Sequence, residues 1–117
     1  MKLENYKDIE SKKLDVKGVV KGITGRVAIG KKDGANNFCM RVFEVEPGGY
    51  APKHVHDWEH EIFFHHGAGE VYSNGEWHAA PAGTTVFIPG NEEHQIRNAG
   101  DSVMTFVCLI PAGAPEI

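Results

Sequence analysis

Long hydrophobic runs are absent from this sequence. The longest lies near residues 106–110, far short of the roughly 20 apolar residues that a membrane-spanning helix needs. Residues 1–16 alternate charged residues with single apolar ones and contain no apolar signal core. We therefore expect a cytoplasmic protein with no membrane partner.

Basic clusters and a large number of cysteines are also lacking. The chain has 12 Lys and Arg against 16 Asp and Glu, with no basic stripe, which argues against nucleic-acid binding. Its two cysteines, Cys39 and Cys108, are expected to be free thiols. With 117 residues, 41% of them hydrophobic, the chain can bury a core without disulfides, and we expect one domain over 1–117.

Short apolar runs separated by turn residues dominate the sequence after a polar lead-in at 1–17. No stretch beyond the lead-in keeps a helical period, and the spacing of the runs is typical of an all-β sandwich or barrel. Asn74-Gly75 predicts a tight hairpin turn, and the Pro-Gly clusters at 47–49 and 89–91 predict further turns. The expected strands are 26–29, 38–46, 61–66, 70–73, 77–79, 84–88, 94–98 and 103–110.

Both faces of the last expected strand are apolar. By the two-residue period of a strand, one face carries Met104, Phe106, Cys108 and Ile110, and the other carries Val103, Val107 and Leu109. In so small a barrel, an apolar outer face needs a cover. We expect a homodimer to supply it; the alternative is that the N-terminal segment folds over this strand.

The seven histidines are clustered: six lie between positions 54 and 78, and the seventh is His94. In an extended strand, His54 and His56 would project from the same face, where one metal ion could meet both. His60 and Glu61 each stand at a suitable distance for a third ligand, and His94 could supply a fourth. Neutral imidazole is the commonest metal ligand, so a metal site is favoured over hydrogen-bonded core histidines or a loose surface cluster.

The order and spacing of these residues resemble the two sequence motifs of the cupins, which are jelly-roll barrels with a double-stranded β-helix. Asn91 stands where the second motif has a glycine, and asparagine tolerates the same left-handed backbone conformation. Both motifs lie within 48–98. The matching residues are Gly48, His54 and His56 in the first motif, and Gly83, Pro89, His94 and Asn98 in the second.

The third ligand is where the resemblance leaves a choice. The usual cupin carboxylate falls at Glu61, but only counting from His60 reaches the glycine that the motif requires, Gly67. The segment 54–63 and the ending at 108–111 are similar to a subgroup of small bacterial cupins whose manganese is held by four histidines. This resemblance implies His54, His56, His60 and His94 as ligands, with Glu61 as the alternative third ligand.

An all-imidazole ligand set is neutral and leaves a divalent ion with its full charge and with open coordination positions. Imidazole suits several transition metals. The resemblance favours Mn or Fe, with Ni, Zn or Cu as alternatives. It implies a metal-dependent oxidoreductase of dioxygenase type that acts on a small organic molecule. The alternatives are a non-enzymatic cupin that binds a small ligand or metal, and an isomerase or lyase that uses the metal as a Lewis acid.

Several other residues are candidates for the pocket. Phe106 and Cys108 would line it if their strand face points inward, although Cys108 could equally be a small core residue. Arg41 would meet an anionic substrate if it shares the inward face with Phe43; otherwise it is a surface arginine. Trp58 is expected to fix the ligand loop by packing; the alternative is that it lines a substrate entrance. The other histidines, His65, His66 and His78, are expected at the surface.

Overall fold

The computed structural model describes all of residues 1–117, and it is all-β, as the sequence predicts. Apart from strands it contains only two single-turn 3₁₀ helices, η1 (Tyr6–Asp8) and η2 (Lys31–Asp33). The strands are β1 (Lys12–Val16), β2 (Val20–Ile29), β3 (Phe38–Tyr50), β4 (His60–His66), β5 (Ala68–Ser73), β6 (Glu76–Pro81), β7 (Thr85–Ile88), β8 (His94–Asn98) and β9 (Met104–Pro111).

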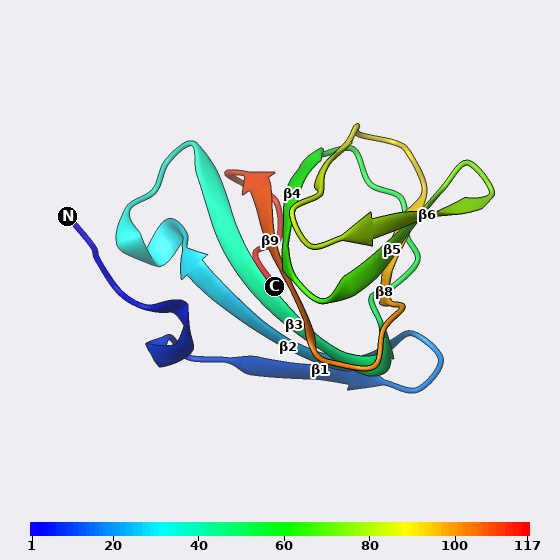
Figure 1. Ribbon diagram of the computed structural model, residues 1–117. Coiled ribbons are helices and arrows are strands. Elements are labelled where there is room, and N and C mark those ends of the chain that lie inside the picture. The colour runs from blue at the N-terminus through cyan, green and yellow to red at the C-terminus, as the bar shows by residue number, and fades with distance from the viewer.

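The strands form one antiparallel sheet in the order β6-β5-β8-β3-β9-β4-β7, and β2 and β1 continue it from β3. This sheet curves into a nearly closed barrel of the jelly-roll type (Figure 1). β4 and β8 are far apart in sequence. The sheet links them because β4 pairs with β9, β9 pairs with β3, and β3 pairs with β8. No helix in the structure has the length and hydrophobicity needed to cross a membrane.

Turn chemistry explains two of the breaks between strands. The hairpin predicted at Asn74-Gly75 is present, with φ of 51° and 81° at the two residues, as this turn type requires. Asn91 also has a positive φ, 66°, in the turn before β8. Asparagine therefore takes the left-handed conformation in which the cupin motif usually has glycine.

The turn predicted at 47–49 is wrong, because β3 runs through these residues to Tyr50. Gly48 has a φ of 79°, and the pairing of β3 with β2 shifts register between Lys21 and Ile23. The irregularity therefore bends the strand as a β-bulge does, without ending it. Gly49 is needed here for close approach, since an added Cβ would lie 2.7 Å from the Lys21 carbonyl oxygen.

The barrel interior is filled by the face of β9 that the sequence predicts to be inward. Met104, Phe106, Cys108 and Ile110 are each at most 3% exposed. The Phe106 ring stacks on Phe43, with centroids 5.1 Å apart. Cys39 and Cys108 are both buried free thiols, as expected.

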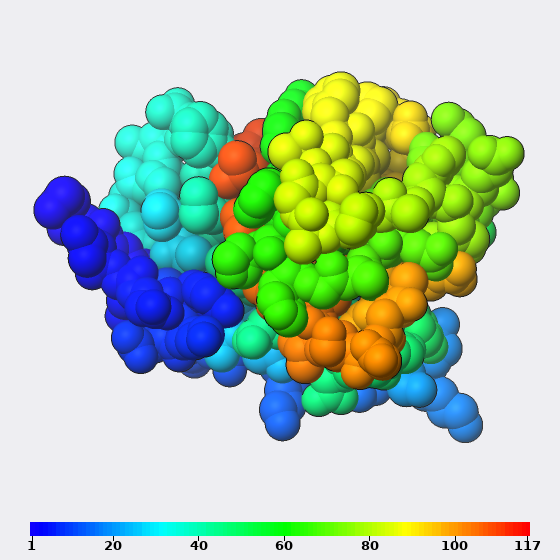
Figure 2. All heavy atoms as spheres, in the orientation of Figure 1, coloured from blue at the N-terminus to red at the C-terminus, as the bar shows by residue number.

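The outer face of β9 is partly exposed, because Val107 and Leu109 are each half-buried. The N-terminal segment instead forms β1 beside β2, and residues before it contact β2, where Arg26 Nε donates to the Ile9 carbonyl at 3.3 Å. Its first residues lie at one edge of the molecule, in blue in Figure 2, where Nζ of Lys2 donates to the Ala28 carbonyl at 2.8 Å. Phe63 of β4 is 43% exposed, and Phe87 of β7 is 60% exposed. Phe63 pairs with Val107, so these side chains and Leu109 form an outer apolar face; Phe87 lies at its edge, separated from Leu109 by Glu61.

Candidate metal centre

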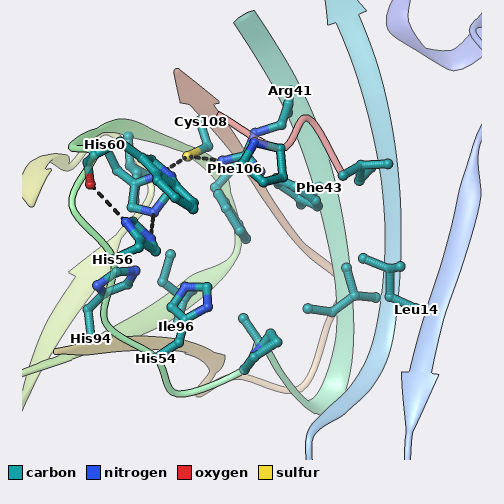
Figure 3. Close-up of a pocket in the computed structure, with 17 residues that line it drawn as sticks. Leu14, Arg41, Phe43, His54, His56, His60, His94, Ile96, Phe106 and Cys108 are labelled. Atoms are coloured by element: carbon teal, nitrogen blue, oxygen red, sulfur yellow. Dashed lines mark hydrogen bonds between the residues drawn. The ribbon is translucent and has the colours of Figure 1, made fainter. Parts of the chain in front are cut away.

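Four histidines from three parts of the chain meet at one end of the barrel interior (Figure 3). One ligand atom from each lies within 4.8 Å of the others. His54 and His56 come from the loop between β3 and β4, His60 is the first residue of β4, and His94 is the first residue of β8. This group, here called the histidine cluster, is the ligand set that the sequence analysis favours.

One detail of that analysis is wrong: His54 and His56 do not lie on a regular strand. His54 forms an isolated β-bridge with His94, in which each backbone N–H donates to the other's carbonyl at 3.1 and 3.0 Å. Farther along, the Asn91 N–H donates to the His56 carbonyl at 2.6 Å. The loop is therefore tied to the start of β8 by backbone bonds. These bonds, rather than a strand, bring the two motifs together.

Hydrogen bonds at Nδ1 orient the rings toward the centre. Nδ1 of His56 donates to the Trp58 carbonyl, and Nδ1 of His94 donates to the Glu92 carbonyl, both at 2.8 Å. Nδ1 of His60 lies 3.2 Å from Sγ of Cys108. Each of these rings therefore keeps Nε2 free for the centre, which is the usual arrangement for histidines that bind a metal.

One distance and one unpaired atom in the centre fit a metal ion. Nε2 of His56 and Nε2 of His60 are 2.9 Å apart, close to the separation of neighbouring ligands around an ion bound at about 2.1 Å. Nε2 of His94 is buried and has no hydrogen-bond partner. A buried polar atom without a partner is costly, and a metal ion at the centre would satisfy it.

Burial keeps three of these imidazoles, those of His54, His56 and His60, neutral. Burial first, and then the neighbouring charges of His94 and Arg41, lowers the pKa of His60 to about 3. Burial likewise lowers the pKa of His54 to about 4, and it lowers the pKa of His56. His54 is the most solvent-exposed of the cluster, so water moderates the effect there. At neutral pH the free ring nitrogens therefore offer lone pairs rather than protons.

Glu61 does not belong to the cluster. It faces outward on β4 and is exposed, and it pairs with Phe87 and Leu109 on the neighbouring strands. A hydrogen bond with the Glu59 side chain, then burial and the Glu59 charge, raises the pKa of Glu61 to about 6. Of the two candidates for a third ligand, the structure brings only His60 to the other histidines, because alternate strand residues face opposite sides.

The cluster faces a cavity of about 380 Å³. All three predicted pocket residues, Arg41, Phe106 and Cys108, line it. Trp58 lines it too and stacks on the His56 ring, with centroids 4.0 Å apart and an interplanar angle of 6°. Trp58 therefore both packs against the ligand loop and walls the cavity.

Sequence reasoning missed the lining from the two ends of the chain. Leu14 of β1 and Ile23 of β2 reach the cavity, as do Pro115 and Ile117. The sequence offers one hint, since Leu14 is an apolar residue among charged ones, and the structure makes it the only half-buried residue of β1. No motif marks these positions, because the path of the sheet decides which residues reach the barrel mouth.

Cys108 lies between the cluster and Arg41. Its Sγ is 3.2 Å from Nδ1 of His60 and 3.0 Å from Nη2 of Arg41. Burial raises the pKa of the Cys108 thiol, and the Arg41 charge partly opposes this.

The remaining histidines, His65, His66 and His78, are exposed, as expected.

The chain is similar in sequence and in structure to several known proteins. A family model described as a cupin domain matches residues 41–110. The crystal structure of the polyketide cyclase RemF from Streptomyces resistomycificus is 30% identical, with a TM-score of 0.89, over 98% of this chain and 82% of that chain. A predicted oxalate decarboxylase from Thermotoga maritima is 23% identical, with a TM-score of 0.82, over 95% of this chain and 99% of that one. At that identity the likeness concerns the fold.

A curated relative matches a shorter segment. The 1-methylthio-D-xylulose 5-phosphate methylsulfurylase of Rhodospirillum rubrum is 32% identical over 73 residues, which are 62% of this chain and 47% of that protein. The chain therefore spans about half the length of this relative. The three named proteins have different activities, so the shared fold leaves the reaction to be argued from the site.

Proposed function

The chain belongs to the cupin family, and from this premise we propose that it is a metal-dependent enzyme acting on a small organic molecule. The histidine cluster would hold one divalent transition metal at the floor of the cavity. The observation that carries this proposal is Nε2 of His94, which is buried, faces three other imidazoles and has no partner. The net charge of −4 favours a small-molecule partner over a nucleic acid, and the two free thiols favour the cytoplasm.

When bound, such an ion supplies a Lewis acid or a redox centre with positions open to the cavity. Mn and Fe are the metals we favour, with Ni, Zn and Cu as alternatives that imidazole also suits. The chain itself supplies the orientation of the ligands through Trp58, Glu92 and Cys108. The apolar walls, including Phe43 and Phe106, would exclude water from a bound substrate.

For the reaction, we favour an oxidoreductase of dioxygenase type, in which dioxygen is the co-substrate. A second candidate is a cyclase, isomerase or lyase reaction that needs only the Lewis acid. It is supported by the similarity to the polyketide cyclase RemF over nearly the whole chain. A third is a cupin that binds a small ligand or metal without turnover, since the cavity would serve binding equally well.

Metal analysis and oxygen uptake test this proposal. We expect about one ion per chain in the purified, tag-free protein, because one cluster offers one set of four nitrogens. Protein loaded with Fe(II) or Mn(II) should then consume oxygen with a member of a panel of catechols, diketones and thiols. Substrate conversion without oxygen uptake would favour the Lewis-acid reaction, and tight ligand binding without conversion would favour the binding role. No metal after incubation with each divalent ion would exclude the site.

We also propose that the outer apolar face is covered by a second copy of the chain. The exposed rings of Phe63 and Phe87 beside the apolar outer face of β9 support this. Light scattering after size exclusion should give twice the 12.8 kDa chain mass. Phe87→Glu should halve that mass, whereas Val19→Glu, at an exposed turn residue, should not. A wild-type protein at the mass of one chain would contradict the dimer.

A further inference from the structure

Two buried side-chain nitrogens in this structure have no hydrogen-bond partner, and both belong to residues that line the same cavity. One is Nε2 of His94, which the proposed metal would satisfy; the other is Nε of Arg41. Native proteins leave few buried polar atoms unpaired, and each one calls for a cause. A metal held by the histidine cluster would lie on the far side of His60 and Cys108 from Arg41, so it would not supply the missing partner.

Arg41 also differs from the other two arginines. Arg26 forms an ion pair with Glu44, and Arg97 forms one with Glu70 at 2.8 Å. No carboxylate stands within ion-pair distance of Arg41. The guanidinium is therefore a partly buried charge without a counter-ion, which is costly unless a ligand completes it.

The contacts that Arg41 does make hold it in place and leave donors free. Nη2 contacts Sγ of Cys108 at 3.0 Å, Nη1 donates to the Glu116 backbone carbonyl at 3.3 Å, and the guanidinium lies 5.1 Å from the Phe43 ring centroid. A guanidinium has five N–H donors, so these contacts leave Nε and two more unused. A carboxylate fits such a planar, pre-positioned set of donors better than any other small anion group except phosphate.

Arg41 and the histidine cluster face the same cavity across apolar walls (Figure 3). Cys108 alone separates the guanidinium from the His60 ring. Phe43, Ile96 and Phe106 form part of the wall. The volume of about 380 Å³ is within the range of small-molecule sites, roughly 300–1,000 Å³.

We propose that Arg41 binds the carboxylate of the substrate, and that the substrate is therefore a small organic acid with an apolar body. Its carboxylate would lie on the free Nη donors of Arg41 and neutralise a guanidinium whose buried Nε has no partner of its own. The apolar body would lie against Phe43 and Phe106, and a second oxygen would point to the metal. The contact between the substrate and the metal rests on the proposed function. The contact between the carboxylate and Arg41 rests only on the unpaired guanidinium.

Binding of benzoate and its neutral isostere benzamide tests the proposal. The full chain loaded with zinc, a diamagnetic ion, would be titrated at pH 7.5 and followed by NMR chemical shifts. A hydrogen-bonded charge contributes about 1.5–3 kcal/mol, so benzoate should bind at least about tenfold more tightly than benzamide. Arg41→Met should abolish that preference, and Arg41→Lys should retain part of it. Arg97→Met, which removes a paired arginine outside the cavity, should leave the preference unchanged.

Two further measurements separate the sources of any affinity. When the titration is repeated without metal, the preference for benzoate should still depend on Arg41. If the preference is lost without metal but persists in metal-loaded Arg41→Met, the ion alone binds the carboxylate. That result would overturn the proposal. Equal affinities for the two probes would overturn it as well. Metal content should stay at about one ion per chain in Arg41→Met. If the wild-type protein binds no metal but still prefers benzoate through Arg41, the proposed metal-dependent function is wrong and the carboxylate site at Arg41 is supported.

Discussion

Replacing His94 with alanine is expected to abolish stable metal binding, with the affinity reduced at least about 100-fold. Changes to residues that merely orient a ligand already cost about 10- to 100-fold, and His94 would itself be a ligand. Its ring stands 4.7–4.9 Å, centroid to centroid, from each of the other three imidazoles. It is also only 4% exposed, so no outside residue or bulk water can readily replace it. Metal content after dialysis against a weak chelator would measure the loss.

Two matched variants make this result interpretable. His78→Ala removes an exposed histidine outside the cluster and should leave one ion per chain. Glu61→Gln neutralises the alternative third ligand and should also retain the ion, whereas His60→Ala should lose it. Metal retained in His94→Ala, or lost in Glu61→Gln, would show that the ligand set is not the histidine cluster. Thermal unfolding of each metal-free variant would separate loss of the site from loss of the fold.

The features that could be predicted from the sequence are those that depend on neighbouring residues of the chain. The strand at 94–98 was predicted to the residue, and Asn74-Gly75 fixed a hairpin, because turn residues act on their own backbone. The inward face of β9 followed from a two-residue period alone. Motif spacing then favoured His60 over Glu61, and strand alternation in the structure agrees with that choice.

What the sequence could not show depends on contacts between distant segments. Pro47, Gly48 and Gly49 are typical of a turn, yet pairing with β2 keeps β3 continuous through a register shift. His54 and His56 are held by backbone bonds to β8, which no local pattern around residue 54 predicts. The state of Arg41 was left open for the same reason: whether a strand arginine has a counter-ion depends on which strands become its neighbours.

Gly90 is where the two motifs depend on each other most closely, and Gly90→Ala is expected to weaken both the fold and the metal site. A Cβ built at Gly90 would lie 2.3 Å from the Asp57 carbonyl oxygen, far inside van der Waals contact. That oxygen is backbone, so the loop carrying His54 and His56 would have to move as a whole. Overpacking of this kind costs about 1–3 kcal/mol. Because Asn91 holds the His56 carbonyl, the movement should also misplace the His56 ring.

Gly34→Ala distinguishes this effect from a general cost of removing a glycine. Gly34 has a φ of 83° and nothing within 4 Å of an added Cβ, so alanine there should cost about 1 kcal/mol of backbone strain. It lies after η2, outside the cavity lining, and should keep metal affinity unchanged. Chemical denaturation of the metal-free proteins and metal titration of the folded ones would give the two quantities separately. If Gly90→Ala lost stability but bound metal as tightly as Gly34→Ala, the contact with Asp57 would matter for folding and not for placing the ligands.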